Sequence, residues 1–116
     1  MADEIFESAT RSKEDLAGVF EYTDGTGYFY LYEMNGDTSR KIVDFIHILS
    51  RPFDIFDRHV SVRWDATEDR VGLFIGGDLW AVFNIVQKTK HGGNYLPGVR
   101  AVIPNGETFL RKTVAH

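Results

Sequence analysis

Cysteine is absent from this chain of 116 residues, and several kinds of chemistry are excluded with it. Without thiols there is no disulfide, no thiolate zinc site, no redox motif and no cysteine nucleophile. The chain also lacks an apolar run of about 18 residues, so we expect no membrane-spanning helix. Residues 1–10 lack the basic and apolar regions of a signal peptide. We therefore expect a cytoplasmic protein with no membrane partner.

Basic residues are scarce in the first half of the chain. Thirteen Lys and Arg stand against 17 Asp and Glu, and the formal net charge is −4. Residues 1–58 hold 12 acidic and six basic residues, whereas residues 59–116 hold five acidic and seven basic residues. Nucleic-acid affinity comes mostly from Lys and Arg that neutralise phosphates, so we predict no nucleic-acid partner. An acidic half permits a basic protein partner.

Aromatic residues are abundant, with nine Phe, five Tyr and two Trp, and such side chains pack well on half-buried sheets. A chain of this length buries roughly 65% of its unfolded surface, which is enough for one core. The predicted fold class is α+β leaning to all-β, an antiparallel β-sheet built from a hairpin, a meander and a terminal hairpin, with at most one or two short helices. Residues 1–15 are expected to form a flexible or weakly helical arm, and residues 16–116 a single β-rich domain.

The first predicted hairpin joins two aromatic runs, Gly18–Thr23 and Gly27–Glu33. An Asp-Gly-Thr turn at residues 24–26 separates them, and glycine supplies the positive φ that a short loop needs. Side chains of a strand alternate between its two faces. In the second run one face holds Tyr28, Tyr30 and Tyr32, and the other holds Phe29 and Leu31. Since both faces are apolar, we expect this strand to lie in the centre of a sheet.

The segment Lys41–Leu49 allows two interpretations. Its apolar residues recur at a spacing of three, which fits one face of a helix. Its β-branched content fits a strand that is buried on both faces, and periodicity cannot decide for so short a run. We favour the strand.

A three-stranded meander is predicted beyond this segment, because apolar runs alternate with glycine-rich or polar turns. The expected strands are Val60–Trp64, Val71–Ile75 and Leu79–Val86 in the meander, and Val99–Ile103 and Thr108–Val114 in the terminal hairpin. The basic, glycine-containing segment Lys88–Asn94 between them is expected to be a mobile loop.

One stretch carries a family resemblance. The block Phe20–Tyr30 (FEYTDGTGYFY), taken with Ile42–Leu49, Trp64 and Leu79–Phe83, resembles a family of small bacterial proteins known only as a conserved domain of unknown function. The similarity runs from about Val19 to Pro97, and its most specific part is the Thr-Gly-Tyr-Phe-Tyr sequence after the acidic turn. The resemblance implies a bacterial, intracellular origin and a compact β-rich domain. It implies no activity and no catalytic residue.

Two glycine-containing patterns do not support nucleotide chemistry. The sequence Gly-Thr-Gly at residues 25–27 lacks the Gly-Lys-Ser or Gly-Lys-Thr that opens the helix of a phosphate-binding loop. The aromatic run from Gly27 to Tyr32 superficially resembles an RNA-binding strand. Its neighbours Glu21, Asp24 and Glu33 have the wrong charge for that role. We expect this run to pack in a core or an interface.

Catalytic and metal sites also find no support in the sequence. The histidines lie at positions 47, 59, 91 and 116 and show neither the His-x-His nor the His-Glu-x-x-His spacing of a metal site. No Gly-x-Ser-x-Gly sequence marks a hydrolase nucleophile. We therefore predict no catalytic residue, no metal and no cofactor.

The leading hypothesis is a non-enzymatic interaction domain that presents a sheet face or edge to a protein partner, or to a second copy of itself as a homodimer. Aromatic residues are the usual anchors of interfaces, and this chain has more of them than a small core needs. The predicted binding residues are Tyr28, Tyr30, Tyr32, His47, His59, Arg63, Trp64 and Trp80. Small size and acidity are also typical of an immunity-type inhibitor of a basic toxin.

The alternative from another class is a small-molecule pocket or a modest enzyme. In that case Tyr and Trp would line a cavity, with His47, His59 or Arg63 at its mouth. Nucleic-acid binding is the least favoured of the three hypotheses.

Overall fold

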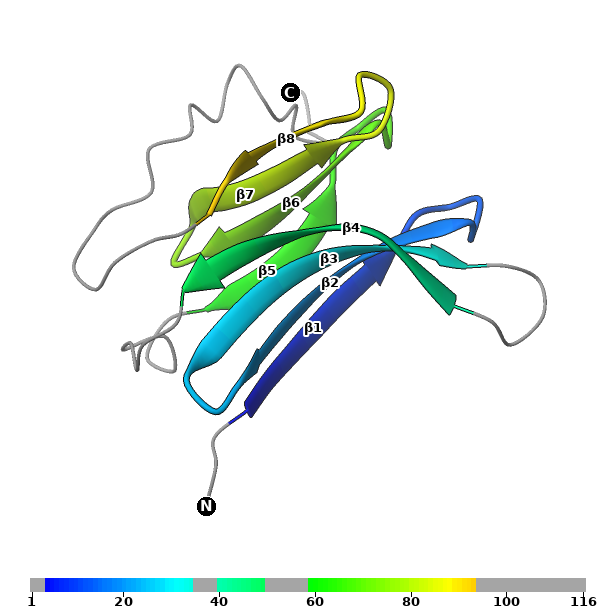
Figure 1. Cartoon of the computed structure of the whole chain (residues 1–116). Coiled ribbons are helices and arrows are strands. Elements are labelled where there is room, and N and C mark those ends of the chain that lie inside the picture. The colour runs from blue at the N-terminus through cyan, green and yellow to red at the C-terminus, as the bar shows by residue number, and fades with distance from the viewer. Residues whose placement is uncertain (1–3, 35–39, 50–58, 94–116) are drawn as a thin grey trace.

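The computed structural model describes residues 4–34, 40–49 and 59–93, and this part of the chain is all-β. Eight antiparallel strands form two four-stranded sheets (Figure 1). The first sheet contains β1 (Glu4–Thr10), β2 (Leu16–Thr23), β3 (Thr26–Met34) and β4 (Arg40–Leu49). The second contains β5 (Val60–Trp64), β6 (Arg70–Ile75), β7 (Asp78–Asn84) and β8 (Thr89–Gly92). Neither sheet includes a helix, and the described residues hold none that could cross a membrane.

Each sheet is a simple meander, with its strands side by side in chain order. Figure 1 shows the blue-to-teal sheet β1–β4 and the green-to-yellow sheet β5–β8 as two layers. Strand β1 lies near β5 at one side, and β4 lies near β7 and β8 at the other. The predicted antiparallel β-sheet, the first hairpin and the meander are therefore confirmed, and β3 lies inside its sheet between β2 and β4.

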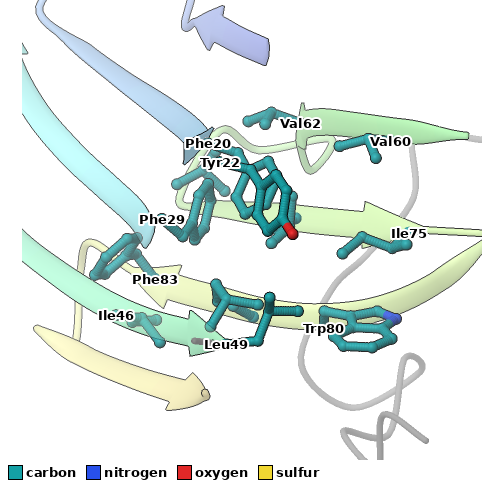
Figure 2. Close-up of a cluster of buried hydrophobic side chains, with 14 of the residues drawn as sticks. Phe20, Tyr22, Phe29, Ile46, Leu49, Val60, Val62, Ile75, Trp80 and Phe83 are labelled. Carbon is teal, nitrogen blue, oxygen red and sulfur yellow. The ribbon is translucent and has the colours of Figure 1, made fainter. Parts of the chain in front are cut away.

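The core lies between the two layers. Strands β2 to β7 contribute the inward side chains of the core, and these residues are at most 8% exposed. The cluster contains Phe20, Tyr22, Phe29, Leu31, Ile46, Ile48, Leu49, Val60, Val62, Val71, Leu73, Ile75, Trp80, Ala81 and Phe83 (Figure 2). Phe29 of the first sheet and Phe83 of the second meet with ring centroids 5.2 Å apart. Burial of one such side chain stabilises the fold by about 1.5–3 kcal/mol relative to exposure.

Two tight hairpin turns contain glycines with positive φ. Asp24 and Gly25, between β2 and β3, have φ values of 54° and 82°, and Gly76 and Gly77, between β6 and β7, have φ values of 63° and 89°. Positive φ at both central residues defines the type I′ turn, whose twist matches that of the flanking strands. Both turns were predicted from the sequence, and both are confirmed.

Strand β4 confirms the strand interpretation of Lys41–Leu49, and its register explains the helix-like spacing. The pairing with β3 is interrupted twice, between Gly27 and Tyr28 and between Leu31 and Tyr32. Each interruption inserts an extra β4 residue, which shifts the later side chains to the other face. Apolar residues three positions apart therefore share a face.

The prediction of a loose arm at residues 1–15 is wrong. Strand β1 pairs with β2 along its whole length, from Glu4 opposite Thr23 to Thr10 opposite Ala17. It is an edge strand whose inward side chains Ile5 and Ala9 reach only the margin of the core. Its sequence is accordingly polar, which is why it gave no strand pattern. No boundary lies at Leu16, because β1 and β2 form one hairpin.

The segment Lys88–Asn94 was expected to be a mobile loop, and this is also wrong for most of its length. Residues Thr89–Gly92 form β8, which pairs with β7 from Asn84 opposite Thr89 to Ala81 opposite Gly92. All four β8 residues are exposed, so the strand carries no hydrophobic pattern. The predicted terminal hairpin at residues 99–114 lies outside the described residues.

Two similar segments build similar turns. Residues 14–20 read EDLAGVF and residues 68–74 read EDRVGLF. Each begins with a glutamate of positive φ, 61° at Glu14 and 62° at Glu68, which ends the loop before the next strand. Gly18 of the first segment faces the core, whereas the matching glycine of the second faces away from it. The similarity therefore encodes a turn and not a repeated packing unit.

A polar cluster joins the two sheets at this end of the molecule. Arg11 forms a two-pronged ion pair with Asp15, at 2.7 and 2.8 Å, and donates to the carbonyl oxygen of Glu68 at 3.0 Å. The hydroxyl of Ser12 donates to the Glu68 carboxylate at 2.9 Å. The loop after β1 is thereby tied to the loop after β5.

Replacement of Gly18 tests the close approach of the sheets. A Cβ atom at this position would lie 2.6 Å from Cγ2 of Val71, which is fully buried and cannot move aside. We expect Gly18→Ala to lower the free energy of unfolding by about 1–3 kcal/mol. Chemical denaturation measures this, with Ser8→Ala on exposed β1 as the control, which should change stability by less than about 0.5 kcal/mol. Equal stability of Gly18→Ala and the wild type would contradict the packing.

The Arg11 ion pair predicts an acid titration. Hydrogen bonding to Arg11 lowers the pKa of Asp15 to about 2. Because the folded-state pKa lies below the unfolded one, the pair stabilises the fold above about pH 4, and this contribution is lost as the pH falls toward 2. In Arg11→Gln, carboxyl NMR should find the pKa of Asp15 near about 4. The control Lys41→Gln should keep the wild-type value, and a wild-type pKa near 4 would contradict the prediction.

Candidate functional site

The outer face of the first sheet is apolar and aromatic. Since Phe29 and Leu31 of β3 point into the core, the alternate residues Tyr28, Tyr30 and Tyr32 point away from it and are each half-buried. The register then fixes which residues of the neighbouring strands lie beside them. We call this surface the tyrosine face, and it consists of Phe6, Val19, Glu21, Tyr28, Tyr30, Tyr32, Ile42, Phe45 and His47.

The rings of the tyrosine face form a continuous array. Tyr30 lies between Tyr28 and Tyr32, with centroid separations of 5.8 Å on both sides. Tyr28 also meets the edge of the Phe45 ring at 5.9 Å and of the His47 ring at 5.2 Å. Offset and edge-on contacts at these distances are favourable. The rings therefore hold one another in place before any partner arrives.

The margins of the tyrosine face are more exposed than its centre. Phe45 on β4 is 49% exposed, Ile42 on the same strand is 47% exposed, and Phe6 on β1 is 62% exposed. Scattered surface hydrophobic residues are ordinary, whereas a contiguous apolar patch usually marks an interaction site. Here exposed apolar side chains of β1 and β4 lie on the same face as the tyrosines of β3, with Val19 and Glu21 of β2 between β1 and β3.

The face has an acidic setting. Residues 4–34 contain seven acidic and two basic side chains. Glu21 lies on the face itself, opposite Phe6 in β1 and Tyr28 in β3. Partial burial raises the pKa of the Tyr30 phenol, and the negative charge of Glu21 adds to the effect. The tyrosine face thus combines apolar rings with the carboxylate of Glu21, and the ammonium of Lys90 lies beside Phe45 at its β4 margin.

Four of the predicted binding residues come together here, namely Tyr28, Tyr30, Tyr32 and His47. The structure adds three exposed residues that the sequence did not single out. Phe45 and Ile42 were missed because the β4 bulges hide the alternation of that strand, and Phe6 was missed because it lies in the polar β1 segment. The only available signal was the apolar pair that Phe6 makes with Ile5.

The two tryptophans lie on the inward side of the second sheet. Trp80 is 1% exposed and belongs to the core, where Figure 2 shows it near Ile75. Trp64 is half-buried at the edge of the core and donates its indole N–H to the carbonyl oxygen of Ala9 at 2.9 Å. Neither residue is part of the tyrosine face. Both serve the packing of the two layers.

The remaining two predicted residues lie apart from the face. Arg63 is exposed on the outer side of the second sheet, with its guanidinium 4.4 Å above the Phe74 ring. His59 is exposed just before β5, and its carbonyl oxygen accepts a hydrogen bond from the N–H of Gly76 at 2.8 Å. In residues 4–34, 40–49 and 59–93 no group of three His, Asp or Glu side chains could hold a metal ion.

Comparison with known proteins assigns a family. The sequence model of the family DUF2251, described as an uncharacterized protein conserved in bacteria, matches residues 1–102. The chain belongs to the DUF2251 family. The resemblance to a bacterial family of unknown function is thereby confirmed, and the match includes β1 and all the other described strands. Neither the curated proteins nor the solved structures gave a match to this DUF2251 chain.

The tyrosine face of this DUF2251 protein predicts an alkaline titration. The raised pKa of Tyr30 favours the neutral phenol in the folded state, so its contribution to stability is complete below about pH 10 and is lost as the pH rises through the folded-state pKa. Tyrosine NMR should show Tyr30 ionising above pH 10. In Glu21→Gln the pKa should fall but stay raised, because burial remains.

Glu33→Gln is the matched control, since Glu33 is exposed on the same sheet but is not among the charges that act on Tyr30. It should leave the titration of Tyr30 unchanged. Identical curves for Glu21→Gln and the wild type would show that Glu21 does not act on the phenol.

Proposed function

We propose that this protein is a non-enzymatic interaction domain that binds a basic partner protein through the tyrosine face. The observation that carries the proposal is the exposure of Phe6, Ile42 and Phe45 around the three tyrosines, on one continuous side of the first sheet. Aromatic side chains supply large contact areas at a low entropic cost and dominate the binding energy of many interfaces.

The central rings of the tyrosine face are held in fixed positions by the sheet, so a partner can bind without rearranging it. Its central rings lie on β3, which is hydrogen-bonded to a strand on each side. The inward neighbours of these rings, Phe29 and Leu31, are 0% and 6% exposed and fix the position of the strand. A preformed surface loses less conformational entropy when it binds. This rigidity supports recognition by shape.

Charge favours a basic partner over a second copy of the chain. A symmetric dimer through the tyrosine face would bring two Glu21 carboxylates to one interface, together with the acidic segment 4–34 that supplies β1, β2 and β3 of each face. Like charges across an interface are unfavourable, whereas a positive surface would be attracted and would associate faster. An inhibitor of a basic protein is one function that fits these features.

The size of the face predicts a moderate affinity. Four strands about 4.8 Å apart and seven to ten residues long give a face of roughly 550 Å². A standard interface buries about 800 Å² on each partner. The partner would therefore also contact acidic residues of segment 4–34 outside the face, and its binding should weaken with added salt. We also propose the bacterial cytoplasm as the compartment, since a chain without cysteine fits a reducing environment.

Capture from an extract of the bacterial host tests the proposal. The wild type should retain a specific basic protein, identified by mass spectrometry, and raised salt should release it. Phe45→Ser removes an exposed anchor of the face and should weaken the binding of the purified partner at least about tenfold. Val86→Ser, at a 68% exposed position in the β7–β8 turn, is the matched control and should bind like the wild type.

Two results would contradict the proposal. The first is that every captured protein binds Phe45→Ser as well as it binds the wild type. The second is a homodimer at micromolar concentration in analytical ultracentrifugation that Phe45→Ser disrupts, which would place a second copy of the chain on the tyrosine face.

A further inference from the structure

A cavity of about 320 Å³ opens between the two sheets, where β2 begins and β7 ends. Ligand pockets in proteins span about 300–1,000 Å³, so this cavity is large enough for a small molecule. None of the eight residues predicted to bind a partner lines it. It is therefore separate from the tyrosine face and from the cavity that the sequence suggested.

The walls of the cavity are apolar and firmly held. Leu31 and Phe83 are 6% and 2% exposed and come from opposite sheets, and Phe83 packs on Phe29 in the core. Leu16 and Ile85 extend this surface toward the opening. A ligand that replaces water here needs an apolar body.

Charged side chains at the cavity leave an excess of positive charge. Asp44 lines the cavity, but it is already paired with Lys90 at 2.8 Å. Partial burial acts to raise the pKa of Asp44, and the hydrogen bonds from Lys90 and from the N–H of Phe45 outweigh it, so that the pKa is lowered. Asp44 is therefore ionised, and its negative charge is balanced by the ammonium group of Lys90.

Lys88 supplies the unbalanced charge. It lines the same cavity, and within the described part of the chain it has no ion-pair partner. Its φ of 58° belongs to the left-handed region, and the turn in which it lies connects β7 to β8. A lysine without an ion-pair partner at the margin of an apolar cavity matches a ligand with one negative charge and an apolar body.

We infer that this cavity binds a small monocarboxylic acid with an apolar body, with the carboxylate at Lys88 and the apolar body on Leu31 and Phe83. A carboxylate accepts hydrogen bonds from an ammonium group, and the pairing is strengthened by charge. The inference does not depend on the tyrosine face.

Calorimetry with three eight-carbon probes tests the head group. Octanoate should bind the full-length protein with a Kd of about 1 mM or tighter and raise its melting temperature. Octanol should bind more weakly, and octylamine, which is a cation at neutral pH, should bind most weakly. Binding of octylamine as tight as that of octanoate, or no binding of octanoate at millimolar concentration, would overturn the inference.

Two pairs of variants locate the site. Val43 is 53% exposed and lines the cavity, so Val43→Trp should fill it and abolish octanoate binding without disturbing the core. Val86→Trp is the matched control, because Val86 is 68% exposed and does not line the cavity. Lys88→Gln should weaken octanoate about three- to fivefold and leave octanol unchanged, whereas exposed Lys13→Gln should change neither.

Unchanged octanoate binding in Val43→Trp would overturn the assignment of the cavity. Equal loss of octanoate and octanol in Lys88→Gln would overturn the role of the ammonium. Because Val43 is not part of the tyrosine face, capture of a partner by Val43→Trp should match the wild type whatever happens at the cavity.

Discussion

The contact between Phe29 and Phe83, with ring centroids 5.2 Å apart, fixes the orientation of β3, and the surfaces of the molecule follow from it. Side chains of a strand alternate with a period of two, so inward Phe29 and Leu31 force the three tyrosines outward. A slip of one residue would exchange the two sets and place phenol hydroxyls in an apolar core, which is unfavourable without partners. The three tyrosines could point inward only if Phe29 and Leu31 left the core.

Strong local patterns made the centre of each sheet predictable from the sequence. The alternation in β3, the apolar runs of the meander and the glycine-containing turns all agree with the structure, which adds that the two hairpin turns are of type I′. The edge strands β1 and β8 were not predictable, because β1 buries little and β8 buries nothing. The other two edge strands, β4 and β5, bury apolar side chains and were predicted. The β4 bulges produced a spacing of three, and no sequence rule would have placed Phe45 beside Tyr28.

Alternation shows which residues share a face but not which face is buried. The pattern of Val60–Trp64 was correct, yet the same pattern is satisfied with Trp64 turned outward or inward. The first sheet decides, because Val60 and Val62 pack against it and Trp64, two residues further along the strand, points the same way. Arg63 is left on the outer side for the same reason. Candidate site residues can thus be sorted only after the partner layer is known.

Strand β4 belongs to both candidate surfaces, because neighbouring residues of one strand point to opposite sides. Asp44 lines the cavity and Phe45 lies on the tyrosine face. Lys90 connects them, since its ammonium group donates to the Asp44 carboxylate at 2.8 Å and to the carbonyl oxygen of Phe45 at 3.0 Å, and lies 5.6 Å from the Phe45 ring. One lysine therefore contacts a residue of each candidate surface, although the two surfaces lie on opposite sides of the strand.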